Sequence, residues 1–361
     1  MGEIRNSLKV NQITFTRFIA AISIVVYHYG KDIFPFNLEV IGFLFKKANV
    51  AVSYFFFLSG FVLVIAYSNK TKINNFSFIK NRFARLYPVY LLAIILIVIY
   101  KAVVNFYNFD LKGMVLNLFM VQSWFPGKAL AFNVPAWSLS VEVFFYALFP
   151  FFFNSFYNGN KLSKNYILII ISFWVLSQIL LHLYMMTDFF EKFASTRVLH
   201  EFFHFFPLMH LNEFLIGNLA GFFFKQNLKT WKKDYDKLIL INLILLLVFL
   251  KYVHVFNYHN GLLLILFLPL VLLISLNSGK ITSIFNKPSL IFLGEISYGI
   301  YILQLPIYII TFKVFKVLNL NNPTLHFYFY LILLIVLSSL SYKLIENPLR
   351  EYIKRSHLSG K

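Results

Sequence analysis

An arginine and a histidine stand eleven residues apart in one apolar segment, TFTRFIAAISIVVYHYG, which has the length of a membrane span. At 100° per residue, eleven steps return to within roughly 20° of the start, so Arg17 and His28 share one helical face. They would be separated by roughly 16 Å along the axis, about half the hydrocarbon thickness. Ionisable side chains at this depth are costly and usually functional. The pair predicts a polar site that crosses the membrane.

Two further arginines, Arg82 and Arg85, occur in KNRFARLYPVY, just before an apolar stretch. Their i, i+3 spacing puts them on one helical face, and Pro88 is expected to begin the next span. Two planar guanidinium groups at the cytoplasmic interface suit phosphate, because each can make a bidentate contact. The alternative is that both arginines only anchor the chain at the interface or contact anionic lipids.

A carboxylate, Glu142, lies within the apolar segment NVPAWSLSVEVFFYALFP, about one turn after Trp137, Ser138 and Ser140. A carboxylate there can orient an imidazole, act as a base or pair with an arginine. The alternative is a helix-terminal glutamate at the interface, with Trp137 as an aromatic anchor.

Other polar residues within apolar stretches are more typical of packing. Small residues such as Ser59 and Gly60 in YFFFLSGFVL usually allow two membrane helices to approach closely. A nucleophilic serine would also need an adjacent base. In LGEISYGIYILQLP, Tyr298, Tyr301 and Gln304 share one helical face, where such residues more often pack than catalyse.

The segment HEFFHFFPLMH formally matches the zinc-protease pattern H-E-x-x-H, with His200 and His204 as ligands and His210 at the third position. The longer pattern needs glycine at the turn, where this chain has Pro207, whose fixed φ cannot make that turn. We therefore interpret the match as coincidental and expect no metal site.

The composition is that of a polytopic membrane protein. The chain is 59% hydrophobic and only 13% charged, against about 25% charged in soluble domains. The absence of cysteine excludes disulfides, thiolate nucleophiles and cysteine metal sites. No cleavable signal peptide is evident at the polar N-terminus. A net charge of +19 could indicate nucleic-acid binding, but basic residues concentrated in alternate loops fit the positive-inside rule better, so no nucleic-acid partner is expected.

These stretches predict an all-α fold of about ten transmembrane helices, near residues 13–30, 50–68, 86–107, 139–156, 165–185, 206–224, 238–254, 260–277, 288–312 and 325–345. With both termini in the cytoplasm, inner segments hold 21 Lys and Arg residues and outer segments hold 9. The outer gap over 108–138 is expected to contain a short re-entrant or interfacial helix around 112–124. No soluble domain fits elsewhere, so residues 1–361 are expected to form one membrane domain, with a polar N-terminus (1–12) and a basic tail (347–361).

Several of these motifs, in this order, resemble one family. The chain is similar to the membrane-bound acyltransferase-3 proteins, bacterial enzymes that add acyl groups to surface polysaccharides and other acceptors. The resemblance runs from the first to the last predicted helix and is carried by these residues: Arg17 and His28; Ser59-Gly60-Phe61; Arg82, Arg85, Tyr87 and Pro88; Trp137-Ser-Leu-Ser-Val-Glu142; Glu213-Phe-Leu-Ile-Gly217; Ser297-Tyr298-Gly-Ile-Tyr301; and Glu346-Asn347-Pro348.

The resemblance implies a membrane O-acyltransferase of the cytoplasmic membrane. Its donor would be acyl-CoA, most often acetyl-CoA, used as a co-substrate with no tightly bound cofactor. Its acceptor would be a hydroxyl of a cell-surface or lipid-linked glycan. The site residues that it implies fall into three groups: catalytic His28, Glu142 and Arg17; donor-binding Arg82, Arg85 and Tyr87; and substrate-binding Trp137, Ser140, Tyr298 and Gln304.

In this scheme a neutral imidazole at His28 removes the proton of the acceptor hydroxyl, with Glu142 as orienting partner or proton acceptor. Arg17 would hold donor phosphate or stabilise developing charge. A covalent acyl-histidine relay is the alternative. Many relatives carry histidine where this chain has Gln304, which can form hydrogen bonds but cannot titrate. The extracytoplasmic hydrolase-like domain appended in some relatives is expected to be absent.

Other classes of protein remain as alternatives. A secondary transporter or flippase would also have buried charges in about ten helices, but it should show repeat symmetry, which the sequence lacks. A lipid-linked glycan-processing protein without acyl transfer would favour a large outer loop with catalytic residues. A membrane zinc protease is the weakest alternative.

Overall fold

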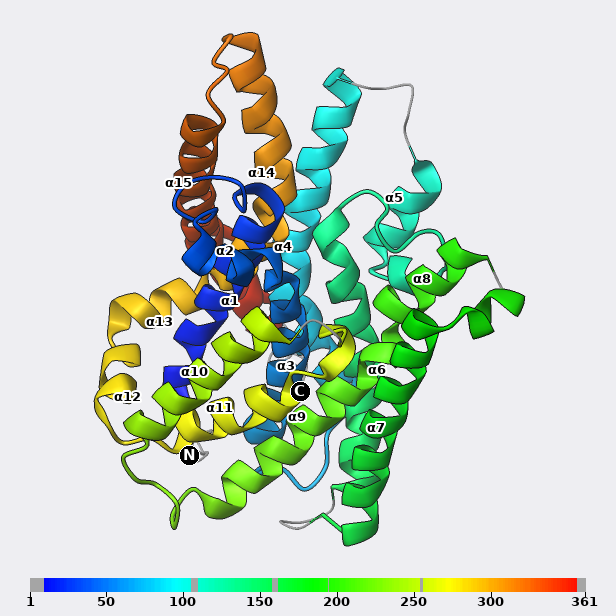
Figure 1. The fold of residues 1–361 in the computed structure, drawn as a ribbon, viewed down its shortest axis with the longest axis vertical. Helices are drawn as coiled ribbons and strands as arrows, with labels where there is room; N and C mark the ends of the chain where they lie inside the picture. The colour runs from blue at the N-terminus through cyan, green and yellow to red at the C-terminus, as the bar shows by residue number, and fades with distance from the viewer. Residues whose placement is uncertain (1–9, 105–109, 158–161, 194, 254–255, 356–361) are drawn as a thin grey trace.

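A computed structural model describes residues 10–104, 110–157, 162–193, 195–253 and 256–355, and these residues are almost entirely helical (Figure 1). They contain no strand, only one isolated bridge between Lys233 and Asn277. The α-helices are α1 (Asn11–Tyr29), α2 (Glu39–Lys46), α3 (Ala51–Tyr67), α4 (Asn75–Val104), α5 (Leu111–Leu118), α6 (Trp137–Phe156), α7 (Lys164–Met186), α8 (Thr196–Phe205), α9 (Pro207–Asn227), α10 (Asp236–Tyr252), α11 (Leu264–Leu276), α12 (Lys280–Phe285), α13 (Pro288–Glu295), α14 (Ser297–Val317), α15 (Pro323–Ser341) and α16 (Asn347–Arg355).

Short helical turns complete the description. Five are 3₁₀ turns and one is a π-helical turn: η1 (Ala48–Val50), η3 (Gln122–Trp124), η4 (Val134–Ala136), η5 (Asp188–Lys192), η6 (His259–Gly261) and the π turn η7 (Tyr342–Glu346). The all-α prediction is therefore confirmed for the described residues. Residues 1–9 of the predicted polar N-terminus and residues 356–361 of the predicted basic tail lie outside them, while the first part of that tail forms α16.

Within the described ranges, six helical segments have the length and apolar composition to cross a membrane: Ala48–Tyr67, Asn75–Val104, Val134–Phe156, Lys164–Met186, Ser297–Val317 and Pro323–Ile353. Helices also occupy the other predicted spans, but they are shorter, less apolar or interrupted. These helices indicate a multi-pass membrane protein. The number of ten transmembrane helices and the cytoplasmic position of both termini stay predictions.

The predicted span 288–312 is wrong as a single helix. α13 ends at Glu295 and α14 begins at Ser297, and the two run in different directions, with α13 crossing beside α1 (Figure 1). The cause is a close contact: a Cβ on Gly294 would lie 2.0 Å from the Thr14 carbonyl oxygen of α1. α13 is thereby held against α1, while α14 runs in a different direction and packs against α15, α1 and α4.

The expectation that Pro88 begins a span is also wrong. Pro88 lies inside α4, a continuous helix of 30 residues that already contains Arg82 and Arg85. A proline removes one backbone hydrogen bond and crowds the carbonyl one turn earlier, yet membrane helices accept prolines where neighbouring groups compensate. The two arginines therefore belong to the rigid helix and not to a loop before it.

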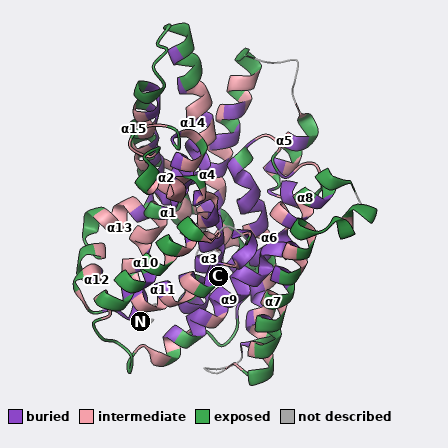
Figure 2. Cartoon of the chain, viewed as in Figure 1, coloured by how far each residue is buried: buried purple, intermediate pink, exposed green. Residues whose placement is uncertain are grey.

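The centre of the protein is built on α3, α6 and α9, where buried residues concentrate (Figure 2). Gly60 of α3 packs directly on α9, as its sequence context predicted, because a Cβ there would lie 2.1 Å from the Phe214 carbonyl oxygen. Phe56, Phe57, Phe61, Phe145, Phe149 and Phe214 fill this region and are all at most 1% exposed. This core fixes the helices whose side chains form the candidate site.

Candidate active site

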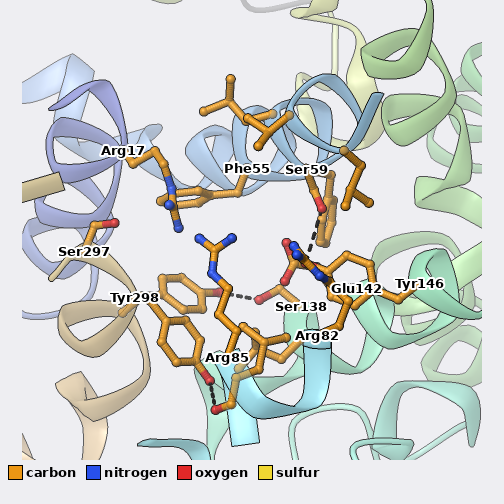
Figure 3. Close-up of a pocket in the computed structure, with 17 residues that line it drawn as sticks. Arg17, Phe55, Ser59, Arg82, Arg85, Ser138, Glu142, Tyr146, Ser297 and Tyr298 are labelled. Atoms are coloured by element: carbon orange, nitrogen blue, oxygen red, sulfur yellow. Dashed lines mark hydrogen bonds between the residues drawn. The ribbon is translucent and has the colours of Figure 1, made fainter. Parts of the chain in front are cut away.

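Arg17, Arg82, Arg85 and Glu142, which are far apart in the sequence, line one small cavity between helices (Figure 3). Its volume is ≈ 90 Å³, room for several water molecules but not for a coenzyme. The remaining lining residues are aliphatic, aromatic or hydroxyl-bearing: Phe55, Phe56, Leu58, Ser59, Val62, Leu63, Leu86, Ser138, Leu139, Tyr146, Ser297, Tyr298 and Tyr301.

Five helices deliver these side chains. Arg17 comes from the second turn of α1, and Arg82 and Arg85 from one face of α4, as their spacing predicts. Glu142 lies in the second turn of α6, with Tyr146 one turn later on the same face. α3 contributes Ser59 and α14 contributes Tyr298. Figure 3 shows Arg17 and Arg85 pointing toward one another across the cavity.

The cavity carries an excess of positive charge. Arg17, Arg82 and Arg85 face one lining carboxylate, Glu142, and none of the four charged groups forms an ion pair within the described residues. The Arg82 Nε atom is buried and has no hydrogen-bond partner there. Gathering three guanidinium groups in a low-dielectric site is unfavourable unless an anion joins them. The arrangement therefore fits an anionic or strongly polarised ligand.

Hydroxyl groups tie the walls of the cavity together. The Ser138 and Tyr301 hydroxyls lie 2.8 Å apart and join α6 to α14. The Tyr298 hydroxyl donates to the Leu86 carbonyl oxygen of α4 at 2.6 Å, and the Ser59 hydroxyl donates to Tyr146 at 3.4 Å. Tyr298 and Tyr301 thus do pack, as expected from their spacing, but they pack as walls of the cavity.

Glu346 is a second acidic residue near the arginines, and sequence reasoning noted it only as part of a terminal motif. It ends the π turn η7, is 3% exposed, and its Oε2 atom has no hydrogen-bond partner among the described residues. Arg85 and Arg17 are among the charges that act on it. The widened turn brings this carboxylate toward the arginine cluster, a placement that helical periodicity does not reveal.

His28 lies at the opposite end of α1 from the cavity. It is in the last turn, exposed, flanked by the rings of Tyr27 and Tyr29, and without a hydrogen-bond partner among the described residues. The charges acting on Glu142 come from Arg85 and Arg17. The structure therefore brings Glu142 to the arginines and does not bring it to His28.

The other predicted site residues lie outside the cavity lining. The Tyr87 hydroxyl donates to the Leu118 carbonyl oxygen at 3.2 Å, which attaches α4 to α5. The buried Ser140 hydroxyl accepts from the Ser123 backbone N–H at 3.1 Å. Gln304 is fully buried, donates to the Tyr301 carbonyl oxygen, and leaves its Oε1 atom unpaired within the described part of the chain. The Trp137 ring packs against His210, with ring centres 5.3 Å apart and planes tilted by 43°.

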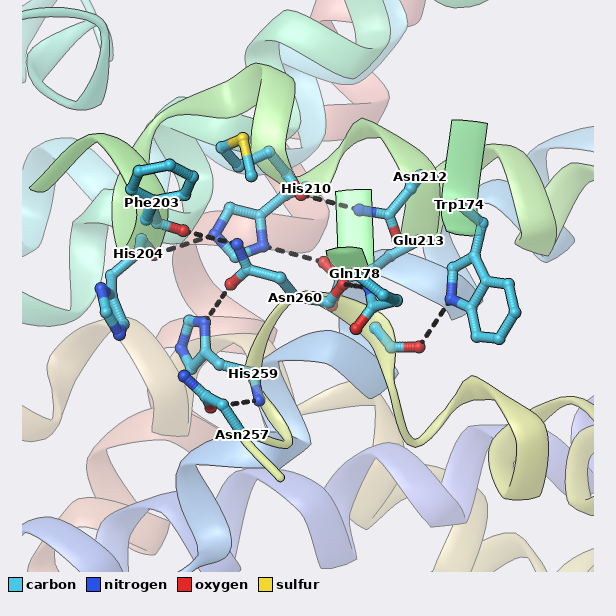
Figure 4. Close-up of polar contacts among 12 residues, drawn as sticks. Trp174, Gln178, Phe203, His204, His210, Asn212, Glu213, Asn257, His259 and Asn260 are labelled. Atoms are coloured by element: carbon cyan, nitrogen blue, oxygen red, sulfur yellow. Dashed lines mark hydrogen bonds and ion pairs between the residues drawn. The ribbon is translucent and has the colours of Figure 1, made fainter. Parts of the chain in front are cut away.

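The H-E-x-x-H segment contributes to a buried polar network instead (Figure 4). His210 hydrogen-bonds Glu213 through Nδ1 and the His204 carbonyl oxygen through Nε2, both at 2.9 Å. The rings of His200 and His204 stack with centres 4.2 Å apart. No group of three potential ligands in the described residues has the geometry to hold a metal ion.

Comparison with known proteins identifies one family. A family model described as an acyltransferase domain, acyltransferase-3, matches residues 10–343. The acyltransferase MdmB of Streptomyces mycarofaciens is 32% identical over 155 residues, which is 40% of each protein. The peptidoglycan O-acetyltransferase OatA of Listeria monocytogenes is 24% identical over 371 aligned positions, which cover 93% of this chain and 55% of OatA. The matches thus span about half or less of these relatives' lengths, and no solved structure matches significantly.

Proposed function

Because the chain belongs to the acyltransferase-3 family, we propose that it is a membrane O-acyltransferase that moves an acetyl group from cytoplasmic acyl-CoA to a glycan hydroxyl. The relatives' names support this class of reaction, and OatA supports acetyl as the acyl group and a cell-wall polysaccharide as the kind of acceptor. The observation that carries the proposal is the cavity of three unpaired arginines at one end of α1, with His28 at the other.

The arginines would bind the donor. Acyl-CoA carries several phosphate groups, and the guanidinium groups of Arg82 and Arg85 can each form bidentate contacts with phosphate. Their position in a cavity favours this role over lipid anchoring, because an anchor would face the headgroups. Since the cavity holds only ≈ 90 Å³, donor binding requires the cavity to widen.

The transfer itself would take place at His28. The pantetheine arm of the donor runs from the arginines along α1, over roughly 16 Å, and presents the thioester to this imidazole. The acceptor hydroxyl attacks the thioester carbonyl carbon while the His28 imidazole takes the hydroxyl proton. The new ester C–O bond forms, the C–S bond breaks, and the imidazolium returns the proton to the departing thiolate. An acyl-histidine intermediate is the second form of this scheme and predicts a trappable acylated His28.

Glu142 and Arg17 would act at the donor end. The Glu142 carboxylate attracts the Arg17 guanidinium, while the Arg85 guanidinium repels the Arg17 guanidinium. Glu142 would therefore offset part of the positive charge at this end before the donor binds, and Arg17 would neutralise donor charge. With both termini in the cytoplasm, this end faces the inner side of the cytoplasmic membrane and His28 faces the outer side, where a glycan acceptor arrives.

Replacement of His28 tests this proposal. The His28→Ala variant, reconstituted in liposomes, should lose acetyl transfer by about 10²–10⁴-fold, because the hydroxyl loses its base. His200→Ala, which removes an exposed histidine of α8, should keep wild-type transfer and controls for loss of an imidazole. Both variants should insert normally, as judged by monodisperse purification. Wild-type amounts of acetylated product from His28→Ala would contradict the scheme.

A further inference from the structure

A second cavity lies at the end of α1 that carries His28, between α1, α14 and α15. Its volume is ≈ 390 Å³, within the roughly 300–1,000 Å³ of small-molecule sites. It shares no lining residue with the arginine cavity, and Tyr29, the residue after His28, forms part of its wall. In Figure 1, α14 and α15 extend together beside the segment that follows α1.

Aromatic rings form much of this wall in a near-parallel array. Tyr29 and Tyr308 stack with centres 4.1 Å apart and an interplanar angle of 23°. Phe312 continues the series, 6.0 Å from Tyr308 at 20°, and is 51% exposed. Where two rings stack they cover each other's faces, so the array offers a ligand its outer faces and its ring edges at little entropic cost, and tyrosine adds a hydroxyl at the ring edge. A pyranose ring has the matching surface, an apolar C–H face bordered by hydroxyl groups.

Polar groups stand at the same cavity. The His326 Nε2 atom lies 3.1 Å from the Thr311 hydroxyl, and its Nδ1 atom has no partner among the described residues. The Asn322 Oδ1 atom accepts from the Leu325 backbone N–H, so its amide N–H groups remain to donate. Asn321, next in the wall, is exposed. Donors and acceptors around aromatic faces suit a hydroxyl-rich ligand better than a lipid chain, which needs neither.

The wall is fixed by contacts from the segment after α1. A Cβ on Gly30 would lie 2.3 Å from the Phe327 ring, so glycine allows the end of α1 to press against α15. The Tyr328 hydroxyl donates to the Phe34 carbonyl oxygen at 2.6 Å and ties this segment to the same helix. The cavity is therefore preformed, which lowers the cost of ordering a ligand.

We propose that the cavity lined by Tyr29, Tyr308 and His326 is a saccharide subsite that holds a pyranose ring of the acceptor beside His28. The proposal rests on the proposed function for the identity of the acceptor. Binding of the sugar ring is a separate event from acyl transfer and can be measured without it.

Saturation-transfer NMR on the full chain in nanodiscs tests the subsite, with N,N′-diacetylchitobiose and cellobiose as probes. The wild type should show saturable contacts to pyranose C–H protons from at least one probe. Tyr308→Ala should weaken them at least tenfold, while Tyr308→Phe, which keeps the ring, should retain most of the effect. Tyr252→Ala removes an aromatic that is 66% exposed at the end of α10 and should change nothing.

Acyl-CoA turnover, followed as free thiol in the same samples, separates the two proposals. Sugar contacts that depend on Tyr308, without any acetyl transfer, would support the subsite and overturn the proposed function. Acetyl transfer whose acceptor KM is unchanged in Tyr308→Ala would overturn the subsite alone. Absence of sugar contacts in the wild type would also overturn the subsite. So would a lipid that copurifies with the wild type and is lost only in Tyr308→Ala.

Discussion

Gly60 of α3 and Gly217 of α9 hold reciprocal positions where these two helices cross. A Cβ on Gly60 would lie 2.1 Å from the Phe214 carbonyl oxygen, and a Cβ on Gly217 would lie 2.1 Å from the Phe57 carbonyl oxygen. Each glycine therefore admits the backbone of the other helix, the arrangement typical of small residues in membrane helix pairs. Ser59, which lines the arginine cavity, is the neighbour of Gly60, so this crossing sets the position of a cavity wall.

Gly60→Ala should separate α3 from α9 and lower stability. The new methyl group meets backbone that cannot rotate away, and overpacking typically costs about 1–3 kcal/mol, which exceeds the gain of up to about 1 kcal/mol from replacing a helical glycine. Thermal unfolding in detergent, followed by fluorescence, should show a lower Tm. Gly299→Ala is the matched control, because the nearest atoms to its Cβ would all belong to Ser338 and would lie no closer than 3.2 Å. An equal or smaller loss in Gly60→Ala than in Gly299→Ala would contradict the backbone-contact argument.

Arg82→Ala should raise the KM for acyl-CoA by roughly tenfold or more, because hydrogen bonds to charged groups contribute about 1.5–3 kcal/mol. Arg82→Lys keeps the charge but loses the bidentate geometry, so it should restore KM only in part. Arg197→Ala provides the control, since the Arg197 side chain is 79% exposed and its one ion pair within the described part of the chain is with Glu201. Initial rates over a range of acetyl-CoA concentrations give these values. An unchanged KM for acyl-CoA in Arg82→Ala would mean that Arg82 does not bind the donor and serves only to orient the chain in the membrane.

Periodicity and charge were sufficient to predict which helices carry the site. The i, i+3 spacing of Arg82 and Arg85 and the burial of Arg17 in an apolar segment follow from local rules, and the structure brings these residues together with Glu142. Tyr146 could have been added by the same rule, because it stands one turn after Glu142. Gly60 was recognised as a packing residue for the same reason.

Contacts between distant segments were not predictable in this way. The break between α13 and α14 depends on the meeting of Gly294 with Thr14, and the approach of Glu346 to the arginines depends on a π turn. Tyr87 and Ser140 form bracing contacts because α5 and the turn η3 after it pack against α4 and α6. Each involves residues that a single sequence places far apart, so no local pattern contains the information.

Acidification should release α5, because Asp110 caps it. The Gly113 backbone N–H, at 2.8 Å, and the Lys128 ammonium, at 3.0 Å, hold the pKa of Asp110 below its usual value. Because the pKa of Asp110 is lower in the folded form, ionised Asp110 stabilises the folded form fully when the pH is above the unfolded-state pKa of about 3.9. This contribution is lost as the pH falls through the lower folded-state pKa. Hydrogen exchange of residues 111–118 against pH, in nanodiscs, measures the effect.

Two variants separate the cap from the ion pair. Asp110→Ala should speed exchange in α5 at neutral pH, because losing an N-cap costs about 0.5–2 kcal/mol. Asp110→Asn keeps a capping oxygen, so it should protect α5 more than Asp110→Ala and should remove the acid dependence. If exchange in Asp110→Asn accelerates with acid as in the wild type, another carboxylate controls this segment.

His210→Ala should destabilise the protein and impair transfer without any metal being involved. His210 and Glu213 are both fully buried and share a 2.9 Å hydrogen bond. Removing the ring leaves a buried Glu213 oxygen without that partner, which costs about 1–3 kcal/mol. Trp137, which opens α6 ahead of Glu142, packs against the same ring. The variant should therefore show a lower Tm and a lower kcat.

The matched control is His200→Ala, because that exposed imidazole, as far as the described residues go, stacks on His204 and meets the Phe205 ring edge-on. His210→Gln retains a donor near Glu213 and should recover part of the Tm. Treatment of the wild type with a strong chelator should leave both Tm and kcat unchanged, since the network is held by hydrogen bonds. A Tm loss on chelation equal to that of His210→Ala would replace this account with a metal-dependent one.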